Sequence, residues 1–356
     1  MFKKIIFDLD GVFFSEEKYF DTAAFTINEL LCNKNYLNLC RESMFLKQQS
    51  NVIRNRIFNH EQNLLFLKDR GINNNWDVVY LLVSFQILQI LRMEFQNSKD
   101  KVTKLINKGI TTDFVNDLQD ICKNKLDSFD FSSFNEELKN THYEGNELIQ
   151  VFNDFIYEEF GVKKQFFNLR DSLWSLGQNV YQEIFHASFK NREEQLLVNH
   201  NVLLQGLNRL RKENILLGVA TGRPKEDVEY AFQKYDLMSY FDANSITTMT
   251  DILEIEKNFS QYAPLGKPNP FPYIRSIAGS QKPLEILLDL KQHNEDFSGV
   301  WIIADSVADM MCARELNCSF IAVLTGKTSR NKFVQLGVFH IFESVEDFFF
   351  NFESLS

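Results

Sequence analysis

Proline is missing from the first part of this 356-residue chain, and all six prolines lie between Pro224 and Pro283. Proline interrupts the interior of a helix, so its absence permits long helices before Pro224. From residue 15 to residue 204, apolar residues recur at spacings of three and four, as in "NELIQVFNDFIYEEF", which is typical of amphipathic helices. This part of the chain is predicted to be all helical.

Long apolar runs are also scarce. The longest, from Val78 to Met93, is interrupted by four polar residues and is shorter than the roughly 18 residues that span a membrane. It predicts a buried helix of a soluble domain and no membrane partner. The chain starts with charged residues that lead into a strand, without the pattern of a signal peptide, and we expect a cytoplasmic protein.

Basic residues and cysteine pairs are few. The net charge of −10 argues against a nucleic-acid partner or an anionic membrane, because both need basic patches. A small phosphorylated ligand fits the charge, since a metal ion and one lysine can hold an anion locally. The five cysteines show no C-x-x-C spacing and are expected to be reduced thiols. Nothing in the sequence indicates an oligomeric state.

From residue 205 the pattern changes to short apolar strands separated by helical stretches. The strand segments are "ILLGVATG", "NSITTM", "VWIIADS", "SFIAVLTG" and "VFHIF". Such alternation predicts a parallel sheet covered by helices on both faces. The opening segment "KKIIFDLD" has the same character and no strand partner near it. We therefore predict an α/β fold: a Rossmann-like, doubly wound parallel sheet in a core domain of residues 1–14 and 205–356, with an all-α cap domain inserted at 15–204.

Polar residues follow several of these strands. The first strand ends in Asp8 and Asp10, and the predicted carboxyl ends of later segments present Thr221, Lys267, Asp305 and Asp309. Ligands of doubly wound sheets bind at this edge. Because Asp8 and Asp10 are two residues apart, they lie on one side of a strand and repel each other unless a cation intervenes or one is protonated.

A magnesium ion would resolve this repulsion. The carboxylates of Asp8 and Asp305, with a backbone carbonyl, are ligands that suit Mg²⁺. Asp10 would then be free to transfer protons, and an aspartate can accept a phosphoryl group covalently. Lys267 and the turn at Thr221 would hold the phosphoryl oxygens.

Four segments together resemble the motifs of the haloacid dehalogenase (HAD)-like hydrolases, in the family's order. They are "DLDGV" from Asp8, "ATGR" with Thr221, Gly266-Lys267-Pro268, and "ADSVAD" from Asp305 to Asp309. The resemblance covers the predicted core; the helical insert matches the family only in its location between the first two motifs. One departure is Ala304, where the family usually has glycine, and we expect little effect from so small a residue.

The resemblance implies a role for each matching residue. Asp8 would attack phosphorus, and Asp10 would protonate the leaving oxygen and then activate water. Thr221, Gly222 and Lys267 would bind the phosphoryl group. Mg²⁺ would be held by Asp8, Asp305 and the main-chain oxygen of Asp10. Asp309 would support these ligands or bind the ion through a water molecule, and Ser306 at the helix start would supply a further donor or orient the ligands.

The presence of Asp10 favours phosphoryl chemistry over dehalogenation, because a halide needs no acid to leave. The resemblance leaves open a phosphatase, a phosphomutase that passes the phosphoryl group to a sugar hydroxyl, and a non-catalytic binding or regulatory protein. We expect a Mg²⁺-dependent phosphatase of a small phosphorylated metabolite, since a cap that closes over the site excludes bulky substrates.

Two further segments have open alternatives. In "RDSLWSLGQNVYQEIF", the side chains of Arg170, Trp174, Gln178 and Tyr181 share one helix face, which could meet substrate but is better explained by packing within the cap. "TGKTSR", residues 325–330, follows a strand end and could line the site or be a plain loop.

Overall fold

The structure is a computed structural model that describes residues 2–40, 50–122, 126–189, 194–292 and 297–355. The chain divides into two compact units. The first, here called the core unit, comprises Met1–Glu16 with Glu193–Ser356, and the second, the helical unit, comprises Glu17–Arg192. The predicted boundary between residues 204 and 205 falls inside helix α9, His200–Lys212, which packs on strand β2 of the core unit.

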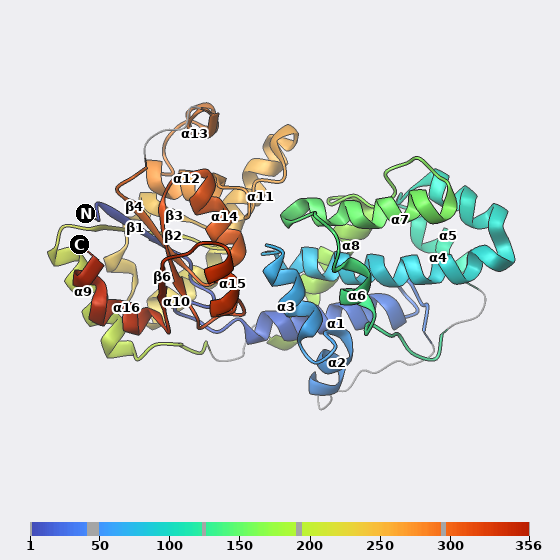
Figure 1. Ribbon diagram of the computed structural model, residues 1–356, viewed down its shortest axis with the longest axis horizontal. Helices are drawn as coiled ribbons and strands as arrows, with labels where there is room; N and C mark the ends of the chain where they lie inside the picture. Colours follow the sequence, from blue (N-terminus) through green and yellow to red (C-terminus); the bar gives the residue numbers. More distant parts are fainter. Residues whose placement is uncertain (1, 41–49, 123–125, 190–193, 293–296, 356) are drawn as a thin grey trace. The chain divides into compact units, whose positions relative to one another are not determined.

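The core unit contains a six-stranded parallel sheet with the order β3-β2-β1-β4-β5-β6 (Figure 1). The strands are β1 (Lys4–Phe7), β2 (Leu216–Ala220), β3 (Ile246–Thr247), β4 (Val300–Ala304), β5 (Ser319–Val323) and β6 (His340–Phe342). Every predicted strand segment forms one of them. The amino-terminal strand lies in the middle of the sheet between β2 and β4, which confirms that the two ends of the chain build one α/β fold.

Helices cover both faces of this sheet. They are α9, α10 (Lys225–Lys234), α11 (Met249–Asn258), α12 (Phe271–Ala278), α13 (Leu284–Gln292), α14 (Val307–Glu315), α15 (Arg330–Gln335) and α16 (Val345–Asn351). Ile5 and Phe7 alternate with Ile6 along β1, and the first two share an apolar cluster with Leu207 of α9 and Phe348 of α16. Helices α12 and α14 contact the strands as well, and the doubly wound arrangement is visible in Figure 1.

The helical unit is built from α1 (Glu17–Cys32), α2 (Ser50–Ile57), α3 (Gln62–Asp69), α4 (Asn75–Lys108), α5 (Phe114–Ile121), α6 (Phe134–Leu138), α7 (Gln150–Phe160) and α8 (Ser172–Ile184). Helix α4 contacts α1, α5, α7 and α8 and forms the centre of this unit. Its backbone departs from helical geometry at Ser98, and Gly109 ends it.

Helix α4 contains the apolar run from Val78 to Met93. The helix is long and apolar enough to cross a membrane by length and composition, but 72% of its most apolar window is buried in the protein. The residues that face neighbouring helices therefore explain its apolar character, and the prediction of a buried helix is confirmed.

Helix α8 includes three of the four residues predicted to share one helix face, and its two aromatic residues serve packing; Arg170 precedes the helix with a φ of 75°, so its predicted place on that face is wrong. Trp174 and Tyr181 are buried, and the indole N–H of Trp174 donates to Asp77 at 2.7 Å. The hydroxyl of Tyr181 donates to the carbonyl of Tyr19 at 3.2 Å. The aromatic side chains of this helix face thus hold the helical unit together.

Candidate active site

The register of the sheet places the predicted site residues side by side. Phe7 of β1 pairs with Val219 of β2 and with Ile303 of β4, so the three strands end at one level. The next residues along each strand reach the same edge, where Asp8, Thr221 and Asp305 are found. The amide of Asp8 donates to the carbonyl of Ile303 at 3.0 Å and fixes this strand end. Parallel pairing therefore gathers residues that are far apart in the sequence.

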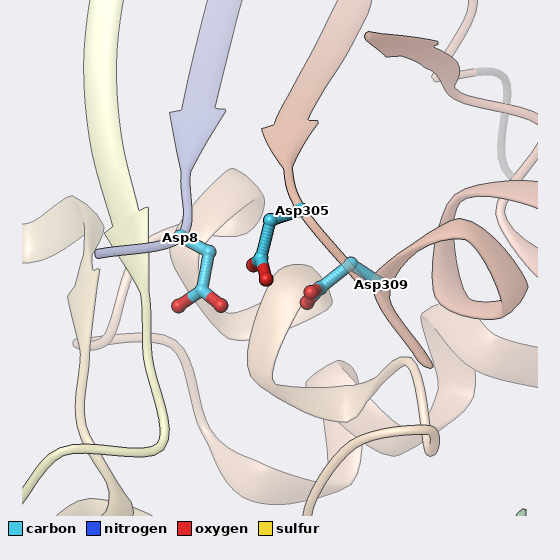
Figure 2. A group of neighbouring side chains, drawn as sticks. All are labelled: Asp8, Asp305 and Asp309. Atoms are coloured by element: carbon cyan, nitrogen blue, oxygen red, sulfur yellow. The ribbon is translucent and has the colours of Figure 1, made fainter. Parts of the chain in front are cut away.

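Asp8, Asp305 and Asp309 form a cluster of carboxylates. One oxygen from each lies within 4.8 Å of the others, and all three residues are buried. Figure 2 shows their side chains turned toward a common space at the ends of β1 and β4. Asp309 lies in the first turn of α14, whose N-cap is Ser306.

Two glycines make room for the carboxylate of Asp305. A Cβ added at Gly11 would lie 2.4 Å from the Asp305 carboxylate, and one at Gly326 would lie 1.7 Å from its Oδ2. Gly11 also has a φ of 73°, which disfavours any other residue. The hydroxyl of Thr325 donates to the carbonyl of Gly11. Thr325 and Gly326 therefore line the site, whereas Ser329 caps and Arg330 begins helix α15 in the same segment, so the segment lines the site only at its start.

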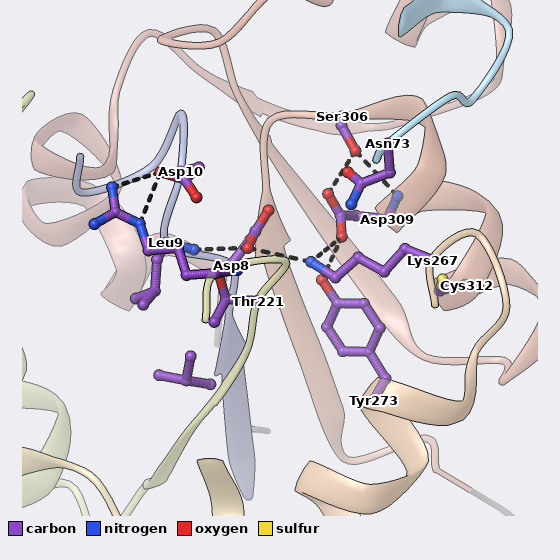
Figure 3. A network of polar contacts seen from close by, with 12 residues as sticks. Asp8, Leu9, Asp10, Asn73, Thr221, Lys267, Tyr273, Ser306, Asp309 and Cys312 are labelled. Atoms are coloured by element: carbon purple, nitrogen blue, oxygen red, sulfur yellow. Dashed lines mark hydrogen bonds and ion pairs between the residues drawn. The ribbon is translucent and has the colours of Figure 1, made fainter. Parts of the chain in front are cut away.

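Lys267 joins two of the carboxylates. Its Nζ lies 2.6 Å from Asp309 Oδ1 and 3.2 Å from Asp8 Oδ1 (Figure 3). The hydroxyl of Tyr273 donates to the same Asp309 oxygen at 2.7 Å. The other oxygen, Oδ2, accepts from the Ser306 hydroxyl at 2.5 Å. Because protein partners occupy both Asp309 oxygens, this residue is better placed to orient Lys267 than to hold a ligand directly.

Burial dominates the electrostatics of this cluster. Desolvation raises the pKa of Asp8 to about 7; the positive charge of Lys267 opposes this shift, and the negative charges of Asp309 and Asp10 add to it. Desolvation also acts to lower the pKa of Lys267, but Asp309 and Asp8 outweigh it and the pKa rises. The lysine therefore stays cationic, and the ionised form of Asp8 lacks sufficient compensation within the protein.

These residues fit a divalent cation. Three carboxylates share a buried space with one ammonium, so the lysine alone does not balance their full ionisation. Carboxylate oxygens are the donors that Mg²⁺ prefers, and both oxygens of the third carboxylate, Asp309, already accept hydrogen bonds from Tyr273 and Ser306. The site therefore suits Mg²⁺ held by Asp8 and Asp305.

Asp10 lies apart from the carboxylate cluster in its own ion pair. The guanidinium of Arg223 donates from Nε and Nη2 to Asp10 Oδ1 at 2.8 and 2.5 Å. Thr221 is buried at the end of β2, and its hydroxyl oxygen accepts from the amide of Arg223 at 3.2 Å. Gly222 is exposed in the turn between them.

The sequence analysis did not identify Arg223 and Tyr273 as members of the site, and it left Thr325 and Gly326 within a segment that could line the site or be a plain loop. Arg223 stood within the quoted "ATGR" segment, and the glycine lay in "TGKTSR", so their positions gave a partial signal. No spacing in the sequence marks Tyr273, because only the packing of α12 against the sheet brings its hydroxyl to Asp309.

Comparison with known proteins agrees with this geometry. A family model described as HAD-hydrolase-like matches residues 264–348, which include Lys267, Asp305 and Asp309. The chain belongs to the HAD-like hydrolase superfamily. A crystal structure from the Northeast Structural Genomics Consortium is 30% identical over 99% of this chain and 99% of its own, with a TM-score of 0.64.

Two more distant solved structures are similar to this HAD-like protein. One is assigned as a β-phosphoglucomutase from Bacteroides vulgatus, with 15% identity over 99% of this chain and 88% of its own and a TM-score of 0.45. Another is assigned as a phosphoglycolate phosphatase from Lactobacillus delbrueckii subsp. bulgaricus, with 13% identity over 98% and 97% and a TM-score of 0.43. No curated protein matches the chain.

Proposed function

We propose that this HAD-like protein is a cytoplasmic, Mg²⁺-dependent phosphatase that hydrolyses a small phosphorylated metabolite through an aspartyl-phosphate on Asp8. The observation that carries the proposal is the buried group of Asp8, Asp305 and Lys267 at one edge of the sheet. It combines a carboxylate nucleophile, a second carboxylate for the metal and a fixed cation.

Each residue would have a defined part in the reaction. The free oxygen of Asp8 attacks phosphorus, and the bond to the leaving oxygen breaks as Asp10 donates a proton to it. Asp10 then takes a proton from water, which attacks the aspartyl-phosphate and releases phosphate. Lys267 would offset charge on the phosphoryl oxygens, and the hydroxyl of Thr221 and the amide of Gly222 would bind them.

The bound Mg²⁺ would supply Lewis-acid stabilisation of the charge on the phosphoryl oxygens. Asp8 and Asp305 would hold it, and the main-chain oxygen of Asp10 is the third proposed ligand. Asp309 would keep Lys267 in place, with Ser306 fixing the Asp309 carboxylate.

The position of the helical unit in the sequence supports a role in choosing the substrate. The chain leaves the core unit at Glu16, soon after Asp10, and returns at Glu193. We propose that this unit is a cap domain that excludes water and admits a small leaving group.

Hydrolysis of 4-nitrophenyl phosphate with Mg²⁺ tests the proposal. The wild-type protein should release nitrophenol, and Asp8→Asn should abolish turnover without loss of the fold, measured by circular dichroism. Asp289→Asn is the matched control, because it makes the same change at an exposed position of the core unit. A folded wild-type protein without activity on a broad panel of phosphate esters would favour a binding or regulatory role.

The same residues would also serve a phosphomutase, since Asp10 can activate a sugar hydroxyl in place of water. The two reactions differ in their product. A sugar phosphate labelled in its phosphoryl group should release labelled inorganic phosphate from a phosphatase, whereas a mutase would move the label to another hydroxyl of the sugar.

A further inference from the structure

Arg223 has an unusual position for a charged side chain, because its guanidinium is completely buried. The side chain is 0% exposed and lies over the ring of Phe14, with 4.7 Å from the guanidinium carbon to the ring centroid. A charge is tolerated in such a place only when ionic partners surround it. Among the described residues, the carboxylates of Asp10 and Glu194 pair with Arg223, and the site described above involves only Asp10.

The three ionic groups form a chain of contacts. Arg223 Nη1 donates to Glu194 Oε2 at 3.0 Å, while Nε and Nη2 hold Asp10 Oδ1. The Glu194 side chain is 2% exposed, and its main-chain carbonyl accepts from the hydroxyl of Tyr235 at 2.7 Å. Glu194 is thus fixed, and it fixes the guanidinium from the side opposite Asp10.

The contacts of Asp10 leave one oxygen for chemistry. The Nε and Nη2 groups of Arg223 both donate to Asp10 Oδ1, and among the described residues no hydrogen bond reaches Oδ2. Figure 3 shows these two contacts to Asp10 as dashed lines. The Asp10 side chain is 16% exposed, in contrast to the fully buried Arg223 side chain. The planar guanidinium donates two N–H groups to Oδ1. These hydrogen bonds fix the rotation of the carboxyl group and therefore the direction of Oδ2.

Two segments of the core unit, one before the helical unit and one after it, pair through their backbones next to these ion pairs. The amide of Ser15 donates to the carbonyl of Gln195 at 2.9 Å, and that of Leu197 donates to the carbonyl of Phe13 at 2.9 Å. The outgoing segment near Asp10 and the returning segment near Glu194 are therefore hydrogen-bonded neighbours, and Arg223 lies between their side chains.

We propose that Arg223 is a positioning residue that aims Oδ2 of Asp10 for proton transfer, and that Glu194 on the returning segment holds Arg223 in that geometry. This inference rests on the proposed phosphatase function. Arg223 itself touches neither the substrate nor the proton. Its effect reaches the reaction only through the orientation of Asp10.

The test uses the dependence of the rate on the leaving group. Nitrophenolate is a stable anion and departs with little help, whereas phenolate needs a proton from Asp10. For Arg223→Lys, which keeps the charge but loses the planar fork, kcat/KM with Mg²⁺ should fall about tenfold more for phenyl phosphate than for 4-nitrophenyl phosphate. Asp10→Asn defines the full effect, and the exposed Arg209→Lys is the matched control that should keep the wild-type ratio.

Glu194→Gln provides a second variant with the same shape, and its ratio should change in the same direction by a smaller factor. Hydrogen exchange at the amides of Ser15 and Leu197 should also quicken in Arg223→Lys, because the ion-pair chain no longer braces these segments. Folding of each variant is checked by circular dichroism.

Equal losses on both esters would overturn the inference, because a merely structural role lowers both rates together. An unchanged ratio in a folded Arg223→Lys protein would overturn it as well. These outcomes differ from failure of the proposed function, in which the wild-type protein hydrolyses neither ester.

Discussion

Gly326 lies against the carboxylate of Asp305 so closely that a Cβ on this glycine would stand 1.7 Å from Oδ2. No rotation of the methyl group can relieve such a clash, since the Cβ position is fixed by the backbone. Gly326, in the loop after β5, therefore shapes the proposed metal site although it contributes no carboxylate to it.

Gly326→Ala should weaken Mg²⁺ binding strongly and lower activity in parallel, because Asp305 must move away from Asp8. Calorimetric titration with Mg²⁺ measures the affinity. Gly177→Ala is the matched control: its Cβ would lie 3.6 Å from Val79, an ordinary contact, inside helix α8. That variant should keep the wild-type affinity and gain up to about 1 kcal/mol of stability from better helix propensity. Unchanged Mg²⁺ affinity in Gly326→Ala would contradict the proposed role of Asp305.

Lys267→Met should destabilise the metal-free protein by about 3 kcal/mol, because it leaves Asp8 and Asp309 buried without a cation. Added Mg²⁺ should recover part of this loss, so the variant should gain more in melting temperature from Mg²⁺ than the wild type does. Thermal unfolding with and without Mg²⁺ measures both effects. The exposed Lys282→Met should show neither, and a Lys267→Met protein as stable as the wild type in EDTA would refute the argument.

Tyr273→Phe removes a single hydroxyl that donates to Asp309 Oδ1 at 2.7 Å inside the core unit. A buried hydrogen bond to a charged group is worth about 2 kcal/mol, so the free energy of unfolding should fall by that amount. Activity should fall with it, because Asp309 then holds Lys267 less firmly. Urea denaturation compares this variant with Tyr230→Phe, whose ring is 59% exposed and whose change should cost little.

Acidification should stabilise the helical unit through Asp171. Desolvation raises the pKa of this carboxyl group, although the hydroxyl of Tyr80 and the amide of Trp174 donate to it. Since the folded protein holds the proton more tightly than the unfolded chain, this contribution to the free energy of unfolding grows as the pH falls from the raised pKa toward the ordinary value for aspartate.

Asp171→Asn should remove that gain, so the variant should lose stability relative to the wild type as the pH falls from neutral toward the ordinary aspartate value of about 3.9. Fluorescence of Trp76 and Trp174 reports unfolding of this unit during urea titration, in a Trp301→Phe background. The exposed Asp100→Asn serves as the control. An equal pH dependence in Asp171→Asn and wild type would show that another group titrates.

Much of the core unit was predictable because its signals are local. A strand that ends in Asp8 and Asp10 and the alternation of strands and helices after residue 205 indicated the parallel sheet, and the structure confirms it. The order of the four motifs indicated the HAD-like superfamily. The boundary of the helical insert was less accurate, since the amphipathic pattern of α9 resembles that of the helices before it.

Other features depended on contacts that no spacing encodes. Tyr273 reaches Asp309 only because α12 packs on the sheet, and Gly326 meets Asp305 only because β5 lies beside β4. Arg223 and Glu194 pair although they are 29 positions apart in the sequence. One lies in a turn and the other in a segment without regular secondary structure, so hydrophobic periodicity does not predict their contact.

The sequence alone determined the types of chemical group and the strands that present them, because residue type and hydrophobic period are properties of short segments. The tertiary structure alone decided which carboxylate faces a lysine, which faces an arginine and which is cradled by glycine. Those choices follow from the registers of parallel strands and from burial, and both exist only once distant parts of the chain have packed together.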